Sequence, residues 1–242
     1  MRRPKGTSGI VEGMRLLQKP PVSRHENCSI TGMTIAAPTI EREPSSGRAQ
    51  QSDILARLKR ETAAEHAAIE EATGLMRPEA TLGDYRHYLE RSHSFYAAVE
   101  RVLQRHDVWD LLGLDAAERT KLPLIADDLE ALGRAPESVP PCAAPPSLPG
   151  LAEALGAAYV LEGATLGGRV ISRHLTSEFG SHVPRRFVNA YGAQTGDNWQ
   201  AFRAALNRFT RSRALEERIV AGAKETFRSY TRWLAERPAR EI

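Results

Sequence analysis

A single histidine, His66, lies in the segment whose residue types and spacing most strongly suggest chemistry. Small or apolar residues recur there every three or four positions, which is the spacing of one face of an α-helix. His66 is therefore expected to point inward, where a buried imidazole needs a polar partner or a metal ion. Glu70, one helical turn further on, could accept a hydrogen bond from the ring and fix its tautomer. The stripe comprises Leu55, Leu58, Thr62, His66, Ile69 and Thr73.

Two interpretations of His66 stay open at this point. One is a core histidine that hydrogen-bonds a neighbour or is partly exposed. The other is an axial ligand of haem iron, since neutral imidazole binds iron through one ring nitrogen. Lys59, two turns earlier on roughly the same side, could then meet a carboxylate at the rim of the pocket.

Three glycines, Gly163, Gly167 and Gly168, fall within a segment that is otherwise helical in character. Each glycine in a helix interior costs about 0.5–1 kcal/mol relative to alanine, so the cluster needs a reason. Close helix–helix packing is one reason, and Gly163 and Gly167 have the spacing for it. A flat ligand lying against exposed backbone is the other, with a kink at Gly167-Gly168 leaving room for O₂.

Composition and charge narrow the class of protein. The chain has 242 residues, with 41% hydrophobic and 26% charged side chains, which is ordinary for a water-soluble globular protein. Residues 1–50 hold eight Lys/Arg and four Asp/Glu, a net of +4, whereas residues 51–242 hold 25 and 26, a net of −1. The excess of basic residues lies in the N-terminal extension and not in residues 51–242. The charge of the latter segment therefore gives no reason to expect a nucleic-acid-binding domain.

Membrane insertion and cysteine chemistry are not indicated either. No apolar run approaches the roughly 18 residues that a membrane-spanning helix needs. Cys28 and Cys142 both fall in irregular segments and suggest neither a disulfide framework nor a zinc site. A reducing compartment fits this usage, so we expect a cytoplasmic protein.

The chain divides into an extension and one helical domain. Residues 1–50 lack periodicity and predict a disordered N-terminal extension, although Met14 or Met33 could also begin a shorter product. Residues 51–242 predict an all-α, single-domain helical bundle. A capping box of Thr81 and Asp84 begins the second helix, and Pro123 interrupts or begins the third. The core stripe of the second helix is expected to include Tyr85, Leu89, Ser92, Tyr96, Val99 and Leu103. Helices are expected at about 52–73, 81–103, 115–133, 151–176, 184–191, 197–209 and 215–235, with a proline-rich loop over 134–149.

Taken together, these segments resemble the haem oxygenases, in particular the bacterial enzymes that make biliverdin for phytochromes. The first matching segment corresponds to the family's proximal helix and the second to its distal helix, in the same order and at a similar separation. A third segment resembles the bacterial members. The matching segments are Leu58-Lys59-x-x-Thr62-x-x-x-His66-x-x-x-Glu70, Leu161-Glu162-Gly163-Ala164-Thr165-Leu166-Gly167-Gly168 and Tyr191-Gly192-Ala193-x-Thr195-Gly196-x-x-Trp199-x-x-Phe202.

The resemblance implies a fold and a reaction. Haem, which is both substrate and cofactor, would lie between the first helix and the kinked glycine-bearing helix. The reaction would be oxidative cleavage of haem to biliverdin, CO and Fe²⁺, using O₂ and electrons from an external reductase. The electron donor would be a ferredoxin or a flavodoxin/ferredoxin-NADP reductase system, and a bacteriophytochrome would receive the biliverdin.

The resemblance also implies residue roles. His66 would be the metal ligand, steered by Glu70. Gly163, Gly167 and Gly168 would bring the distal helix close to the haem, so that O₂ leans toward one meso carbon. Further residues expected to bind the cofactor are Lys59 and Arg203, at positions that meet haem propionates, together with Thr62, Tyr159 and Ala164.

Ala164 is a departure from the mammalian members, which carry an aspartate directly after the first distal glycine. That aspartate orders the water that protonates bound dioxygen, and a methyl group cannot do so. Bacterial members also lack it, so other groups would form the proton relay. Ala164 keeps open a second hypothesis, a non-enzymatic haem carrier or sensor. A third, a thiaminase-like enzyme, would need a cysteine in the bundle interior, where neither Cys28 nor Cys142 is placed.

Overall fold

The computed structural model describes residues 53–236 of the chain. Every regular element in this part is helical, which confirms the predicted fold class. The predicted extension over residues 1–50 lies outside the described residues and stays a prediction, as does its boundary with the helical domain. The α-helices are α1 (Ile54–Glu61), α2 (Ala63–Thr73), α3 (Leu82–Arg105), α4 (Val108–Leu112), α5 (Ala116–Arg119), α6 (Leu122–Ala131), α7 (Leu151–Phe179), α8 (Thr195–Phe209) and α9 (Arg213–Ala235).

Local sequence explains several of the helix ends. Thr81 and Asp84 form the predicted capping box at the start of α3, with the Asp84 backbone nitrogen 3.2 Å from Thr81 Oγ1. Pro123 lies in the first turn of α6, where a missing N–H costs nothing. The proline-rich segment over 134–149 is a loop with one short 3₁₀ turn, Pro136–Ser138.

Two expectations about the elements were wrong. The first helix is interrupted at Thr62, which ends α1 and precedes α2. Residues 184–191 form turns rather than a helix, because the buried Asp128 carboxylate accepts hydrogen bonds from the backbone nitrogens of Arg186 and Phe187. The expected break at Pro123 is confirmed, because the segment over 115–133 contains two helices, α5 and α6, and this proline lies in the first turn of the second.

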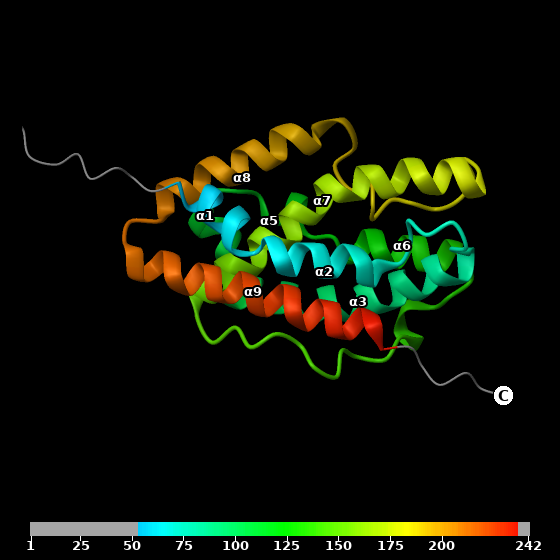
Figure 1. Ribbon diagram of the computed structural model, residues 1–242, viewed down its shortest axis with the longest axis horizontal. Coiled ribbons are helices and arrows are strands. Elements are labelled where there is room, and N and C mark those ends of the chain that lie inside the picture. Colours follow the sequence, from blue (N-terminus) through cyan, green and yellow to red (C-terminus); the bar gives the residue numbers. More distant parts are fainter. Residues whose placement is uncertain (1–52, 237–242) are drawn as a thin grey trace, which may run out of the picture. The chain divides into compact units, whose positions relative to one another are not determined.

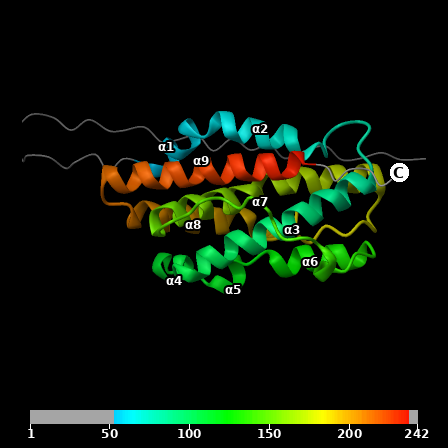
Figure 2. The ribbon, with the colours of Figure 1, turned by 90° about the horizontal axis from the view of Figure 1, so that it is seen from below.

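Helices α7 and α9 form the central pair of the bundle, and their backbones come very close. A Cβ atom on Gly156 would collide with the backbone of α9 at Ile219, and one on Gly222 would collide with the backbone of α7 at Glu153. Helices α1 and α2 lie on one side of this pair, and α4, α5 and α6 lie on the other (Figure 2). The core contains the predicted stripe of α3, with Tyr85, Leu89, Ser92, Tyr96, Val99 and Leu103 all buried.

Helix α7 is the longest of the described helices and changes direction part-way along (Figure 1). Its first half is buried in the bundle, whereas much of its second half is exposed. The glycine segment lies between these halves, at the position where the sequence predicts a kink. Among residues 53–236, no helix is both long and apolar enough to cross a bilayer.

Candidate functional site

His66 lies in the first half of α2, and its surroundings differ from those expected. Its side chain is 57% exposed, so the expectation of a buried imidazole was wrong. The ring packs edge-on against Phe227 of α9, with 5.9 Å between the ring centroids. Nδ1 lies 3.5 Å from Oε1 of Glu70, and Nε2 has no partner among residues 53–236. The arrangement orients the ring and leaves one nitrogen available to a ligand.

Helix α2 carries no buried residue along its whole length, although Leu55 and Leu58 on the same predicted stripe are buried in α1. Its main packing partner is α9. An ion pair between Glu65 and Arg228, with oxygen and nitrogen 2.7 Å apart, helps to hold α2 there. The break at Thr62 explains the difference in burial, because it separates the core-facing helix from the helix that carries His66.

The three glycines of α7 fall on two faces of the helix. A Cβ atom on Gly167 would meet nothing within 4 Å, and one on Gly163 would meet only the Trp199 ring, at 3.9 Å. A Cβ atom on Gly168 would instead collide with the backbone carbonyl of Val188. Gly168 therefore has a packing reason to be glycine, whereas Gly163 and Gly167 belong to an open face.

Tyr159 connects the open face of α7 to the helix break before His66. Its hydroxyl lies near the side chain of Thr62, and burial raises the pKa of Tyr159. Its ring lies beside that of Trp199 in α8, with 5.9 Å between centroids. Since Tyr159 and Gly163 are one turn apart, the structure brings Thr62, Tyr159, Gly163 and Trp199 together.

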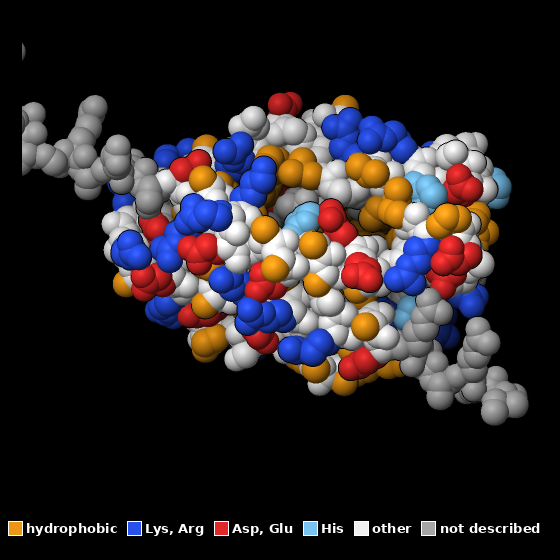
Figure 3. Space-filling view, viewed as in Figure 1, with side chains coloured by type: hydrophobic (Ala, Val, Ile, Leu, Met, Phe, Trp, Pro, Cys, Tyr) orange, Lys and Arg blue, Asp and Glu red, His pale blue; other side chains and the backbone are white. Residues whose placement is uncertain are grey.

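A hollow lies at this place on the molecular surface. Figure 3 shows it between α2 and α8, with hydrophobic side chains around it and a histidine in its wall. Lys and Arg side chains gather on its rim over α8 and α1 (Figures 1 and 3). The exposed apolar side chains of α7 include Leu166 and Val170, at 40% and 46% exposure. They flank Gly167, so this stretch of α7 presents apolar surface without a protein partner covering it.

The remaining sequence-predicted residues lie on the same elements. Lys59 is exposed on α1, and Arg203 is half-buried on α8, one turn after Trp199. Neither makes an ion pair within residues 53–236, so both cations are available to an anionic ligand. Ala164 is exposed beside Gly163 and offers no polar group.

A buried polar cluster next to the glycines was missed from the sequence. Glu162 is 1% exposed and forms ion pairs with Arg119 and Lys121. The Tyr191 hydroxyl donates to Glu162 Oε1 at 2.7 Å and accepts from Lys121 Nζ at 2.7 Å. Burial lowers the pKa of Lys121 while the Glu162 carboxylate opposes that shift, and burial together with that carboxylate raises the pKa of Tyr191. The sequence did contain one indication of this cluster, since a glutamate within the apolar stretch of α7 needs buried polar partners.

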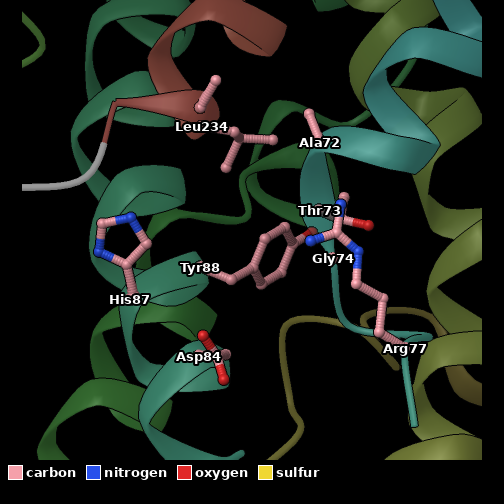
Figure 4. A pocket seen from close by; sticks show the side chains of 9 residues that line it. Ala72, Thr73, Gly74, Arg77, Asp84, His87, Tyr88 and Leu234 are labelled. Carbon is pink, nitrogen blue, oxygen red and sulfur yellow. The ribbon is translucent and has the colours of Figure 1, made fainter. Parts of the chain in front are cut away.

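A separate cavity opens at the other end of α2, between α2, α3 and α9 (Figure 4). It is lined by Gly74 and Arg77, by Tyr88 of α3 and by Leu234 of α9. None of the site residues predicted from the sequence lines it. This cavity is therefore distinct from the hollow beside His66.

Comparisons with known proteins agree with this architecture. The sequence model of the Heme oxygenase family matches residues 52–236. A protein named Heme oxygenase from Xanthomonas campestris pv. campestris (strain 8004) is 32% identical over 153 residues, covering 62% of this chain and 88% of that protein.

Two solved structures have a similar fold. One is the NO- and CO-bound heme oxygenase of Neisseria meningitidis, with a TM-score of 0.62, 22% identity and coverage of 75% of this chain and 90% of that one. The other is the heme oxygenase of Leptospira interrogans, with a TM-score of 0.61, 17% identity and coverage of 76% and 99%. The fold is thus the helical fold of these proteins. Because the family match spans most of the sequence, the chain belongs to the heme oxygenase family.

Proposed function

We propose that this protein is a biliverdin-producing haem oxygenase, cleaving haem to biliverdin, CO and Fe²⁺ with O₂ and externally supplied electrons. The observation that carries the proposal is the pairing of an oriented, ligand-accessible His66 with the open glycine face of α7. A Cβ atom is missing where a flat molecule would lie, and apolar side chains flank that place. These features fit haem, since its faces are apolar and its iron takes an axial imidazole.

Bound haem would supply the iron that activates O₂ and the porphyrin edge that is oxidised. His66 would hold the haem through Nε2, and Glu70 would fix the ring orientation from the Nδ1 side. The closely placed backbone at Gly163 and Gly167 would limit the distal space to a small ligand. Thr62 and Tyr159 would close one side of the site, with Ala164 beside Gly163.

Electrostatics supports a defined orientation of the substrate. Lys59 and Arg203 have no ion-pair partner within residues 53–236, and both belong to elements at the rim of the hollow. We assign Lys59 and Arg203 to the two propionates of haem. A carboxylate at the edge of a partly desolvated site is stabilised most by a cation that has no other ion-pair partner.

The electron donor is proposed to be a ferredoxin or a flavodoxin/ferredoxin-NADP reductase system, and the receiver of biliverdin a bacteriophytochrome. The proposed location is the cytoplasm, where such donors operate. These assignments depend on the family resemblance and not on a docking surface in the structure.

The exposed methyl group of Ala164 favours a second candidate function, a haem carrier or sensor, since it cannot organise water for proton delivery. Mixing the pure protein with hemin, then adding reductant in air, separates the two. Conversion of the Soret band into biliverdin absorption supports the enzyme. A Soret band that persists under these conditions selects the carrier and contradicts the oxygenase proposal.

A further inference from the structure

The glycine segment of α7 must be held in place from faces that the substrate does not touch. Gly167, Leu166 and Val170 are exposed, so packing on the open side does not fix the segment. Glycines also weaken the helix itself at this point. On one other face, the Val188 backbone rests against Gly168, in a loop that the buried Asp128 carboxylate anchors.

Glu162 provides a second anchor, directly before Gly163. Its carboxylate pairs with Arg119 and Lys121 from the end of α5 and the start of α6, and it accepts a hydrogen bond from Tyr191. Lys121 Nζ also donates to the Arg119 carbonyl at 2.7 Å, and its backbone nitrogen donates to Glu100 Oε1 at 2.7 Å. With Glu100 included, the charges of the cluster balance, so each buried ion has an opposite neighbour.

The same cluster reaches α8 at the residue next to Trp199. Arg119 donates through Nη1 to the Asn198 carbonyl at 3.1 Å and through Nη2 to Asn198 Oδ1 at 3.2 Å. Trp199 is the residue whose ring lies against Gly163 and beside Tyr159. Through Arg119, the Glu162 carboxylate therefore sets the spacing of α7 and α8 at Gly163.

We propose that Glu162 is a positioning residue for the site: with Arg119, Lys121 and Tyr191 it fixes the glycine segment of α7 and Trp199 relative to each other, and thereby the distal space over the substrate. This inference rests on the proposed function for the identity of the substrate. The positioning itself is a property of the protein without haem, so it can be tested separately.

The first test is hydrogen–deuterium exchange on the full-length protein without hemin, comparing wild type with Glu162→Gln. The amide keeps the shape of the carboxylate but leaves Arg119 and Lys121 with Glu100 as their one remaining counter-charge in the cluster. We expect exchange at least about tenfold faster over residues 160–170 and 191–199, the size expected when buried donors lose a charged partner. Glu216→Gln is the matched control, because Glu216 is also buried and pairs with Arg57 at 3.0 Å. In Glu216→Gln, we expect faster hydrogen–deuterium exchange only in α1 and at the start of α9.

The second test is the infrared C–O stretch of the ferrous CO complex, which reports the space and polarity on the distal side. Glu162→Gln is expected to shift or split the band, and Glu216→Gln to leave it unchanged. Tyr191→Phe removes one hydrogen bond to Glu162 without unpairing a charge, so it provides a milder variant if Glu162→Gln does not fold. It should shift the band in the same direction by a smaller amount.

The outcomes separate the two proposals. Faster exchange spread evenly over the chain, or a CO band unchanged in both Glu162→Gln and Tyr191→Phe, overturns the positioning role. Wild-type protein that binds no hemin overturns the proposed function and, with it, the role of Glu162 toward haem. Localised exchange together with a shifted band supports the inference, whatever the turnover rate of the wild type.

Discussion

The hydroxyl of Tyr159 in α7 lies near the side chain of Thr62, the residue at which α1 ends and α2 begins. His66 follows Thr62 by one helical turn, and Gly163 follows Tyr159 by one turn. This contact therefore joins the helix that carries the histidine to the helix that carries the glycines, at one side of the hollow.

Replacing Tyr159 with Phe should remove the hydroxyl from this contact while keeping the ring contact with Trp199. We expect the free energy of unfolding to fall by about 0.5–1.5 kcal/mol, the size expected when one partly buried polar contact is lost. Hemin affinity should also fall. Urea denaturation and absorbance titration measure the two effects, and unchanged values for both would show that the hydroxyl contributes nothing to the site.

His66→Ala should abolish turnover, because the only imidazole proposed to bind the iron is lost. Added imidazole should restore part of the activity by occupying the vacated space. The ferric absorption spectrum and single-turnover biliverdin yield provide the measurements. Glu70→Gln is the milder companion variant, which keeps the ligand but weakens its orientation. An unchanged ferric spectrum and normal turnover in His66→Ala would exclude His66 as the proximal ligand.

Gly167→Leu and Gly168→Leu should behave differently, although the family resemblance implies that both glycines bring the distal helix close to the haem. A leucine at Gly167 points into open space, so the protein should fold normally while haem or O₂ loses room. A leucine at Gly168 meets the Val188 backbone, and such overpacking costs typically about 1–3 kcal/mol.

Melting temperature and biliverdin yield, measured on both variants, test this division. Low yield with a normal melting temperature is expected for Gly167→Leu, and a lowered melting temperature for Gly168→Leu. The reverse pattern would mean that Gly168 and not Gly167 faces the substrate.

Deleting residues 1–50 should leave hemin affinity and turnover within about twofold of the full chain, since the segment has no periodicity and its own charge balance. Titration with hemin and a single-turnover assay on both proteins are sufficient. A large loss of affinity would instead assign the extension a part in closing the site.

The free energy of unfolding should decrease as the pH is lowered, in part because the Glu61 carboxylate becomes protonated. A hydrogen bond from Arg57 lowers the pKa of Glu61 below its usual 4.5, with Lys224 contributing. Because the folded state binds this proton less readily than the unfolded chain, the stabilisation is present above about pH 4.5 and is lost as pH falls through the lowered value. Glu61→Gln should therefore flatten the dependence of melting temperature on pH below 4.5. Glu79→Gln, at an exposed glutamate without an ion pair in residues 53–236, should not flatten it.

The sequence by itself determined the helical class, the buried stripe of α3 and the elements on which the candidate site lies. These features follow from periodicity and capping, which are local properties. The family resemblance added the pairing of His66 with the glycines, as two motifs in a fixed order.

Only the tertiary structure decided how these parts face one another. Whether His66 is buried depends on the break at Thr62 and on which side of α2 packs against α9. Which glycine is open and which is packed depends on Val188, twenty residues after Gly168. The cluster around Glu162 joins residues separated by 41 and 43 positions, and no short-range pattern encodes such a meeting of buried charges. The spacing of residues along a helix determines which of them share a face, whereas the elements packed around the helix determine whether that face is buried or open to a ligand.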